Sequence, residues 1–311
     1  MDDHCMTMAE AAGGVFSRVE ALRWGMSDND LTRLVRAGRL TRPRRGVYAL
    51  PTSGGNREEE HAYRVRAILR GRPASCAAAR STLALAQLPL VRADLSTVLL
   101  CGAGKERFRR GDVVTYPLPS GEKGITIGGA PSVSIETAIF QTVARDGLTT
   151  AIVAADAALH RGLVTPESLE RRRVGLRRLA PRGRQLMESV DGASESPGES
   201  LMRLILVGLG HDVQIQVVIT TPDGEFVARV DALVDDWIVM EFDGAGKYGD
   251  ADGRDALIRE KRREDALRAL GYIVVRVTWR DLFTPGRVAA LVRAAQAQLR
   301  ARSATPRAAA R

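Results

Sequence analysis

The sequence predicts a multidomain α/β (α+β) protein with three folded regions and a short tail. At 311 residues it is longer than one ordinary hydrophobic core accommodates. Its content of 45% hydrophobic and 27% charged residues is typical of a globular protein. Small and turn-forming residues at 191–198 separate a mixed region from a regular αβββαβ series. We therefore divide the chain into residues 1–52, 53–190, 191–302 and 303–311, the last a disordered basic tail.

Region 1–52 is predicted to be a winged helix-turn-helix. Ser17 and Ser27 stand where helix N-caps are favoured, each with an acidic residue three positions later. Leu31 and Leu34 fall on one face of the second helix, as expected for a helix packed on a core. Residues 40–50 place Pro and Gly between extended residues, which resembles a β-wing.

Six arginines of this region are candidate DNA-binding residues. In a helix-turn-helix, the second helix enters the major groove and flanking groups bind phosphates. No acidic residue interrupts positions 33–45, and the net charge of the chain is +9, which favours a polyanionic partner. The alternative is a solvated arginine face with a structural role only. The six are Arg33, Arg36, Arg39, Arg42, Arg44 and Arg45.

Region 53–190 is predicted to be a mixed α/β connecting domain. The patterns indicate helices over 58–70 and 75–87, short strands within 96–135 and helices within 136–190. Eight arginines lie between positions 161 and 184. We expect this region to connect and position the two ends of the chain.

Region 191–302 carries acidic residues at predicted strand ends. Asp231 and Glu241 each end an apolar run, and Asp243 shares the strand face of Glu241. Converging carboxylates bind hard divalent ions such as Mg²⁺ or Mn²⁺, and such an ion can activate water for phosphodiester hydrolysis. These three acids are therefore predicted to hold Mg²⁺ or Mn²⁺. The alternative is that they are ordinary polar residues at strand ends.

The length of one loop decides whether the first two acids meet. A three-residue loop at 235–237 sets Asp231 opposite Glu241, whereas a two-residue turn sets Met240 opposite Asp231. The metal hypothesis predicts the three-residue loop.

Three further residues complete the candidate catalytic set. Glu199 stands at a helix start, where it either joins the acids or caps the helix. Lys247 and Lys261 are candidates for stabilising charge on the scissile phosphate, with a solvated surface position as the alternative for each.

Four short motifs mark the first region: Gly13-Gly14-Val15-Phe16, Trp24-Gly25-Met26-Ser27, Leu34-Val35-Arg36-Ala37-Gly38-Arg39-Leu40 and Arg45-Gly46-Val47-Tyr48. Together they resemble the N-terminal winged helix of AbiEi-type antitoxins. The resemblance implies DNA binding, often for self-repression, and raises a toxin protein as a further partner. Residues 56–190 are similar, more diffusely, to the middle part of such proteins.

A second set of motifs lies in the third region: Ser196-Pro197-Gly198-Glu199-Ser200, Arg229-Val230-Asp231, Val239-Met240-Glu241-Phe242-Asp243-Gly244, Arg259-Glu260-Lys261-Arg262-Arg263-Glu264-Asp265, and Gly271-Tyr272 through Val277-Thr278-Trp279-Arg280-Asp281-Leu282. They resemble the DUF559 domain, a relative of very-short-patch-repair endonucleases in the PD-(D/E)xK superfamily. The resemblance implies a restriction-endonuclease-like αβββαβ domain with Glu199, Asp231, Glu241 and Asp243 at its site. The chain departs from the pattern where Lys247 and Tyr248 replace a frequent His, and where Asp243 occupies the usual Lys position.

These observations lead to three functional hypotheses. The first is a Mg²⁺-dependent endodeoxyribonuclease that a winged helix targets to DNA. The second is a non-catalytic, antitoxin-type transcriptional regulator with a vestigial nuclease fold, and the third is a protein-interaction scaffold. No apolar run reaches the roughly 18 residues of a membrane span, and the N-terminus lacks signal-peptide character, so we expect a cytoplasmic protein.

Overall fold

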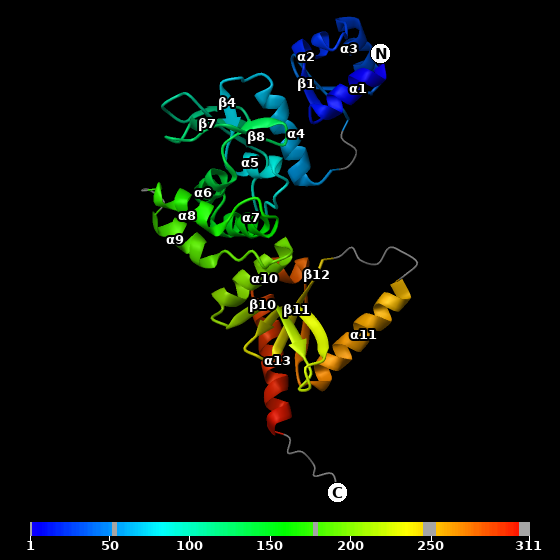
Figure 1. The fold of residues 1–311 in the computed structure, drawn as a ribbon, viewed down its shortest axis with the longest axis vertical. Helices are drawn as coiled ribbons and strands as arrows, with labels where there is room; N and C mark the ends of the chain where they lie inside the picture. Colours follow the sequence, from blue (N-terminus) through cyan, green and yellow to red (C-terminus); the bar gives the residue numbers. More distant parts are fainter. Residues whose placement is uncertain (1, 52–54, 177–179, 245–252, 305–311) are drawn as a thin grey trace. The chain divides into compact units, whose positions relative to one another are not determined.

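The computed structural model describes residues 2–51, 55–176, 180–244 and 253–304. It has a mixed α/β architecture with three separate sheets (Figure 1). The chain divides into two compact units, Met1–Val190 (unit 1) and Asp191–Arg311 (unit 2). Unit 1 contains the three-stranded and six-stranded sheets, and unit 2 contains the four-stranded sheet. None of the helices in the described ranges combines the length and apolar composition that crossing a bilayer requires.

Unit 1 begins with short helices and a small antiparallel sheet in the order β1-β3-β2. The predicted N-caps are confirmed, because Ser17 Oγ accepts a hydrogen bond from the Glu20 amide and Ser27 Oγ accepts one from the Asp30 amide. Each acidic side chain in turn accepts a bond from the amide of its capping serine. The elements are α1 (Asp2–Ala11), β1 (Val15–Ser17), α2 (Arg18–Arg23), α3 (Asp28–Arg36), β2 (Thr41–Arg44) and β3 (Val47–Ala49).

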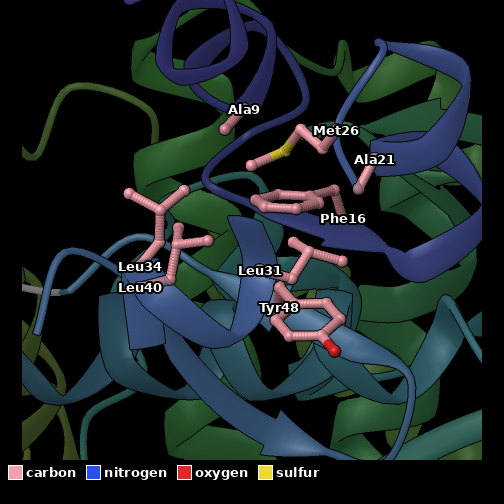
Figure 2. Close-up of a cluster of buried hydrophobic side chains, with 8 residues drawn as sticks. All are labelled: Ala9, Phe16, Ala21, Met26, Leu31, Leu34, Leu40 and Tyr48. Carbon is pink, nitrogen blue, oxygen red and sulfur yellow. The ribbon is translucent and has the colours of Figure 1, made fainter. Parts of the chain in front are cut away.

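A cluster of buried apolar side chains holds these elements together (Figure 2). Phe16 lies in the cluster, with its ring centroid 5.1 Å from that of Trp24 and 6.1 Å from that of Tyr48. Leu31 and Leu34 enter it from α3 and are 0% and 2% exposed, as the periodicity predicted. Complete burial of a leucine contributes about 1.5–3 kcal/mol, so these two residues fix the inward face of α3. The cluster comprises Ala9, Phe16, Ala21, Met26, Leu31, Leu34, Leu40 and Tyr48.

The rest of unit 1 is a six-stranded mixed sheet, in the order β6-β7-β5-β4-β9-β8, together with helices. The strands predicted within 96–135 and the helices predicted within 136–190 are present. The elements are α4 (Arg57–Leu69), β4 (Ser75–Ala77), α5 (Arg80–Leu85), β5 (Val98–Gly102), β6 (Phe108–Arg110), β7 (Val113–Pro117), β8 (Ile125–Ile127), β9 (Ala130–Ser132), α6 (Ile135–Arg145), α7 (Leu148–His160), α8 (Pro166–Val174) and α9 (Ala180–Ser189).

One predicted helix of this region is wrong at its start. Residues 75–77 form β4, and α5 begins only at Arg80. Cys76 pairs with Cys101 of β5, and Ala77 pairs with Ser132 of β9, so β4 occupies the middle of the sheet. Pairing on both edges overrides the helical propensity of this alanine-rich segment.

Unit 2 contains the predicted order of one helix, three strands, a helix, a strand and a final helix. Its sheet has the order β10-β11-β12-β13, in which β12 and β13 are parallel and the other pairs antiparallel. The elements are α10 (Pro197–Gly208), β10 (Val213–Thr220), β11 (Phe226–Val234), β12 (Ile238–Asp243), α11 (Gly253–Ala269), β13 (Ile273–Thr278), α12 (Trp279–Phe283) and α13 (Arg287–Ala304).

Two details of unit 2 differ from the prediction. The short helix α12 was not predicted; Thr278 caps it, because its hydroxyl accepts a hydrogen bond from the Asp281 amide. The tail was expected to begin at residue 303, but α13 continues to Ala304. Residues 305–311 lie outside the described ranges.

The two faces of the four-stranded sheet carry different helices. Leu267 of α11 packs in a buried cluster with Val230 of β11 and Val239 of β12. Helices α10 and α13 also contact the sheet, and Phe242 of β12 lies against Gly198 of α10. Successive side chains of a strand point to opposite faces, so Val239 and Glu241 share the face that α11 covers.

Unit 1 also buries a histidine. His61 of α4 is 1% exposed, and its ring nitrogens lie 2.9 Å from the Leu95 carbonyl oxygen and 3.0 Å from Ser81 Oγ. The Leu95 carbonyl can only accept, so Nδ1–H donates to it and Nε2 accepts from the serine hydroxyl. Burial lowers the pKa of His61 to about 4, which keeps the ring neutral at physiological pH.

Unit 1 should lose stability between about pH 6.5 and pH 4. In that interval the unfolded chain binds a proton at His61 and the folded chain does not, so falling pH favours unfolding, by about 3 kcal/mol at pH 4. The free energy of unfolding, measured across this range, should therefore fall less steeply in His61→Asn than in the unmodified protein. His160→Gln, at an exposed histidine of α7, is the matched control. Parallel pH profiles for the protein and His61→Asn would contradict the assignment.

Candidate functional site

All six predicted DNA-binding arginines are solvent-exposed. Arg33 and Arg36 lie on α3, Arg39 follows the helix, and the others belong to the β2–β3 hairpin. We call these six exposed positions, along α3 and the hairpin that follows it, the α3–wing surface. It consists of Arg33, Arg36, Arg39, Arg42, Arg44 and Arg45.

Capping and ion pairs hold the start of α3. The Asp30 carboxylate accepts hydrogen bonds from the amide and hydroxyl of Ser27, at 3.0 and 2.6 Å. These bonds to Ser27, followed by the bond from Arg33, lower the pKa of Asp30 to about 2. The guanidinium of Arg18 on α2 also donates to both carboxylate oxygens of Asp28. The acidic first turn of α3 is thus occupied by structural contacts, whereas arginines lie in its last turn.

Contacts with the rest of unit 1 brace the β2–β3 hairpin. Gly46 forms its turn with φ of +75°, a conformation that favours glycine. The hydroxyl oxygens of Thr41 and of Tyr63 on α4 lie 2.8 Å apart. At the other end of β2, Arg44 Nη2 lies 3.2 Å from Asp112 Oδ1, in the β6–β7 turn. Sequence reasoning missed Tyr63 and Asp112 because they lie far from the hairpin along the chain.

Residues 6–51 match the model of the family described as "Transcriptional regulator, AbiEi antitoxin". The matched segment, which we call the AbiEi-like domain, includes the buried cluster around Phe16 and the whole α3–wing surface. The family match therefore covers both the residues that form the core of the domain and its six exposed arginines. No curated protein matches the chain.

In unit 2, the β11–β12 hairpin has the three-residue loop that the metal hypothesis predicted. Val234 pairs with Ile238 and Ala232 pairs with Met240, which leaves residues 235–237 as the loop, and the pairing ends one residue before Asp231 and Glu241. Asp231 Oδ2 also accepts a hydrogen bond from the Phe242 amide at 2.8 Å. Asp231 therefore lies beside the end of β12, where its charge helps to raise the pKa of Glu241.

An arginine of α11 already neutralises Glu241. The glutamate is 9% exposed, and its Oε1 lies 2.8 Å from Arg263 Nη2 in ion-pair contact without the geometry of a hydrogen bond. Burial raises the pKa of Glu241; Arg263 opposes this effect, and the neighbouring charges of Glu260 and Asp231 add to it. Arg263 also binds Glu260, which Arg276 of β13 contacts in turn. These ion pairs link Glu241 to α11 and, through Glu260, α11 to β13.

Glu199 is likewise engaged by its surroundings. Its Oε2 accepts hydrogen bonds from the Glu195 amide and from Gln216 Nε2, each at 2.9 Å. Gln216 has φ of +54°, unusual for a residue other than glycine, and is skipped in the β10–β11 pairing, which continues in the same register from Ile215 to Val217. Glu199 therefore ties the start of α10 to an irregularity in β10.

Two of the predicted metal ligands have protein partners in this arrangement, because Asp231 accepts a hydrogen bond from the Phe242 amide and Glu241 contacts Arg263. Within the described ranges, no three His, Cys, Asp or Glu side chains are grouped so that they could hold a metal ion. The Glu241 side chain contacts Arg263. Asp243 is the last residue of β12, and its backbone lies opposite Thr278 of β13. Lys261 is exposed on α11, and Lys247 lies outside the described residues. Sequence reasoning missed Arg263 and Gln216, since only the packing of α11 and the irregularity in β10 bring them to the acids.

Replacing Arg263 with Met should destabilise unit 2 by about 2 kcal/mol, because it leaves the buried Glu241 carboxylate unpaired. The loss should be smaller than for a fully buried pair, because the Arg263 side chain is 29% exposed. Chemical denaturation at neutral pH provides the measurement. Lower pH should shrink the deficit, because protonation removes the charge of a carboxyl group whose folded-state pKa is raised.

Two further variants test whether the pair is the cause of this loss. Adding Glu241→Gln to Arg263→Met should restore part of the stability. Arg262→Met, at an exposed neighbour on α11, should cost little. If the two single arginine variants were equally stable, the ion pair would not be what keeps Glu241 in place.

Proposed function

We propose that this protein is a DNA-binding transcriptional regulator of antitoxin type. The observation that carries the proposal is the family match over residues 6–51, which contains all six arginines of the α3–wing surface. The family description also includes an antitoxin role, so the proposal extends to a toxin protein as a second partner.

The proposed DNA contact uses the AbiEi-like domain as a winged helix-turn-helix. Helix α3 enters the major groove, and the β2–β3 hairpin is the wing that lies along the phosphate backbone. Each arginine that neutralises a phosphate releases condensed counterions, so affinity falls as salt concentration rises. The buried Leu31 and Leu34 keep α3 from rotating on the core, which presents its arginines to the DNA at little cost in ordering.

Replacing Arg36 and Arg45 together with Gln should weaken DNA binding at least tenfold at moderate salt. It should also reduce the slope of log K against log salt by about two, one for each lost phosphate contact. Fluorescence anisotropy with a labelled mixed-sequence duplex, repeated over several salt concentrations, measures both quantities.

The matched control for this experiment is Arg293→Gln with Arg300→Gln, at two exposed arginines of α13 in unit 2. It removes the same charge and should leave the slope unchanged. If neither pair of substitutions weakened DNA binding, the α3–wing surface would not be the DNA contact. Absence of nucleic-acid binding by the unmodified protein would favour an interaction scaffold.

A second candidate function is metal-dependent hydrolysis of DNA by unit 2. The observations that favour it are the αβββαβ order of the unit and the hydrogen bond from the Phe242 amide to Asp231, next to Glu241 in β12. The ion pair between Arg263 and Glu241 favours the regulator instead, so the nuclease ranks second.

A cleavage assay separates the two candidates. We expect the protein to shift the mobility of duplex DNA without cutting it in Mg²⁺ or Mn²⁺, because Arg263 occupies Glu241. Single-stranded DNA should also remain intact. Metal-dependent cleavage that Asp231→Asn and Glu241→Gln both abolish would establish the nuclease and overturn this expectation.

A further inference from the structure

The β6–β7 hairpin of unit 1 is a second basic, exposed element. It is antiparallel, with Arg110 paired to Val113 across a tight turn, and β6 is an edge strand of the six-stranded sheet. Every residue from 103 to 112 is exposed. This hairpin lies outside the AbiEi-like domain matched at residues 6–51, and the sequence analysis assigned it no role.

The composition of this exposed segment is typical of a nucleic-acid contact. Lys105, Arg107, Arg109 and Arg110 surround Phe108, whose residue surface is 60% exposed. A single exposed apolar residue is ordinary on a protein surface, but an aromatic ring among arginines combines phosphate binding with a surface for contacting sugars and bases. Alternation along β6 sets Phe108 and Arg110 on one face, so the ring and a cation point the same way.

Intramolecular contacts hold the arginines on the hairpin. The Arg107 guanidinium lies 5.9 Å from the centroid of the Tyr116 ring on β7. Arg109 Nε donates a hydrogen bond to the Gly111 carbonyl oxygen at 3.2 Å. Side chains that are ordered in this way lose less freedom when a phosphate binds.

One ion pair joins this hairpin to the wing. Arg44 Nη2 of β2 lies 3.2 Å from Asp112 Oδ1 in the β6–β7 turn. Asp112 is thereby paired, and the two hairpins meet at this contact. A DNA backbone that follows the wing would reach the β6–β7 hairpin next.

We propose that the β6–β7 hairpin is a second DNA-contacting arm, which extends the α3–wing surface along the flanking duplex. Arg109 and Arg110 project from opposite faces of β6 and bind phosphates on its two sides, and Phe108 packs against the sugar and base edges beside Arg110. The proposal rests on the proposed DNA binding of the AbiEi-like domain. It also gives the middle of the chain a share in recognition, beyond connecting the two ends.

The test measures binding of the full-length protein to a labelled mixed-sequence duplex of about 30 bp, roughly 100 Å long. Arg109→Gln with Arg110→Gln should lower the salt slope by about two and the affinity about tenfold. Phe108→Ala should lower the affinity about fivefold and leave the slope unchanged, because it removes an uncharged contact. All three positions are exposed, and circular dichroism verifies that the variants remain folded.

The control is Arg182→Gln with Arg184→Gln, at two exposed arginines of α9 in the same unit. An equal loss of slope in this control would mean that bulk charge alone is measured, and it would overturn the arm. The arm would also be overturned if Arg109→Gln with Arg110→Gln left the salt slope unchanged while Arg36→Gln with Arg45→Gln lowered it. That result would still support the proposed DNA-binding regulator. Failure of the unmodified protein to bind the duplex would overturn both proposals.

Discussion

The burial of Leu31 and Leu34 against Phe16 is the constraint on which the DNA-binding proposal depends (Figure 2). A helix with two leucines in a core has one orientation, because rotating it would expose apolar surface at a cost of several kcal/mol. Arg33 and Arg36 of α3 then face solvent. Apolar packing within the domain thus determines where its cations lie.

In unit 2, strand packing likewise determines where a charged side chain lies, but there the charge is buried. Glu241 follows buried apolar residues of β12, so the strand carries its carboxylate under α11, where a charge is costly without a partner. Arg263 supplies that partner. A metal ion at Glu241 would have to compete with Arg263 for the carboxylate. We therefore interpret Glu241 as part of a buried ion-pair network. The αβββαβ order of elements therefore does not by itself imply nuclease chemistry.

Local chemistry allowed much of the fold to be predicted. The serine caps of α2 and α3, the inward leucines and the three-residue loop at 235–237 all depend on residues close together in the chain. Residues 75–77 show the limit of such reasoning, because an alanine-rich segment becomes β4 when strands from elsewhere pair with both of its edges. The arginines of the α3–wing surface all lie within one short segment, so the sequence alone was enough to single them out.

The sequence by itself determined which residues are cationic, which are apolar at helical spacing and which acids end strands. Only the tertiary structure decided what each charge meets. It pairs Arg44 with Asp112, Glu241 with Arg263 and Glu199 with Gln216. The physical reason is that periodicity and capping act over a few residues, whereas the partner of a charge is set by packing between segments distant in the chain. A list of carboxylates can therefore suggest a metal site, but the fold decides whether their oxygens are free to form one.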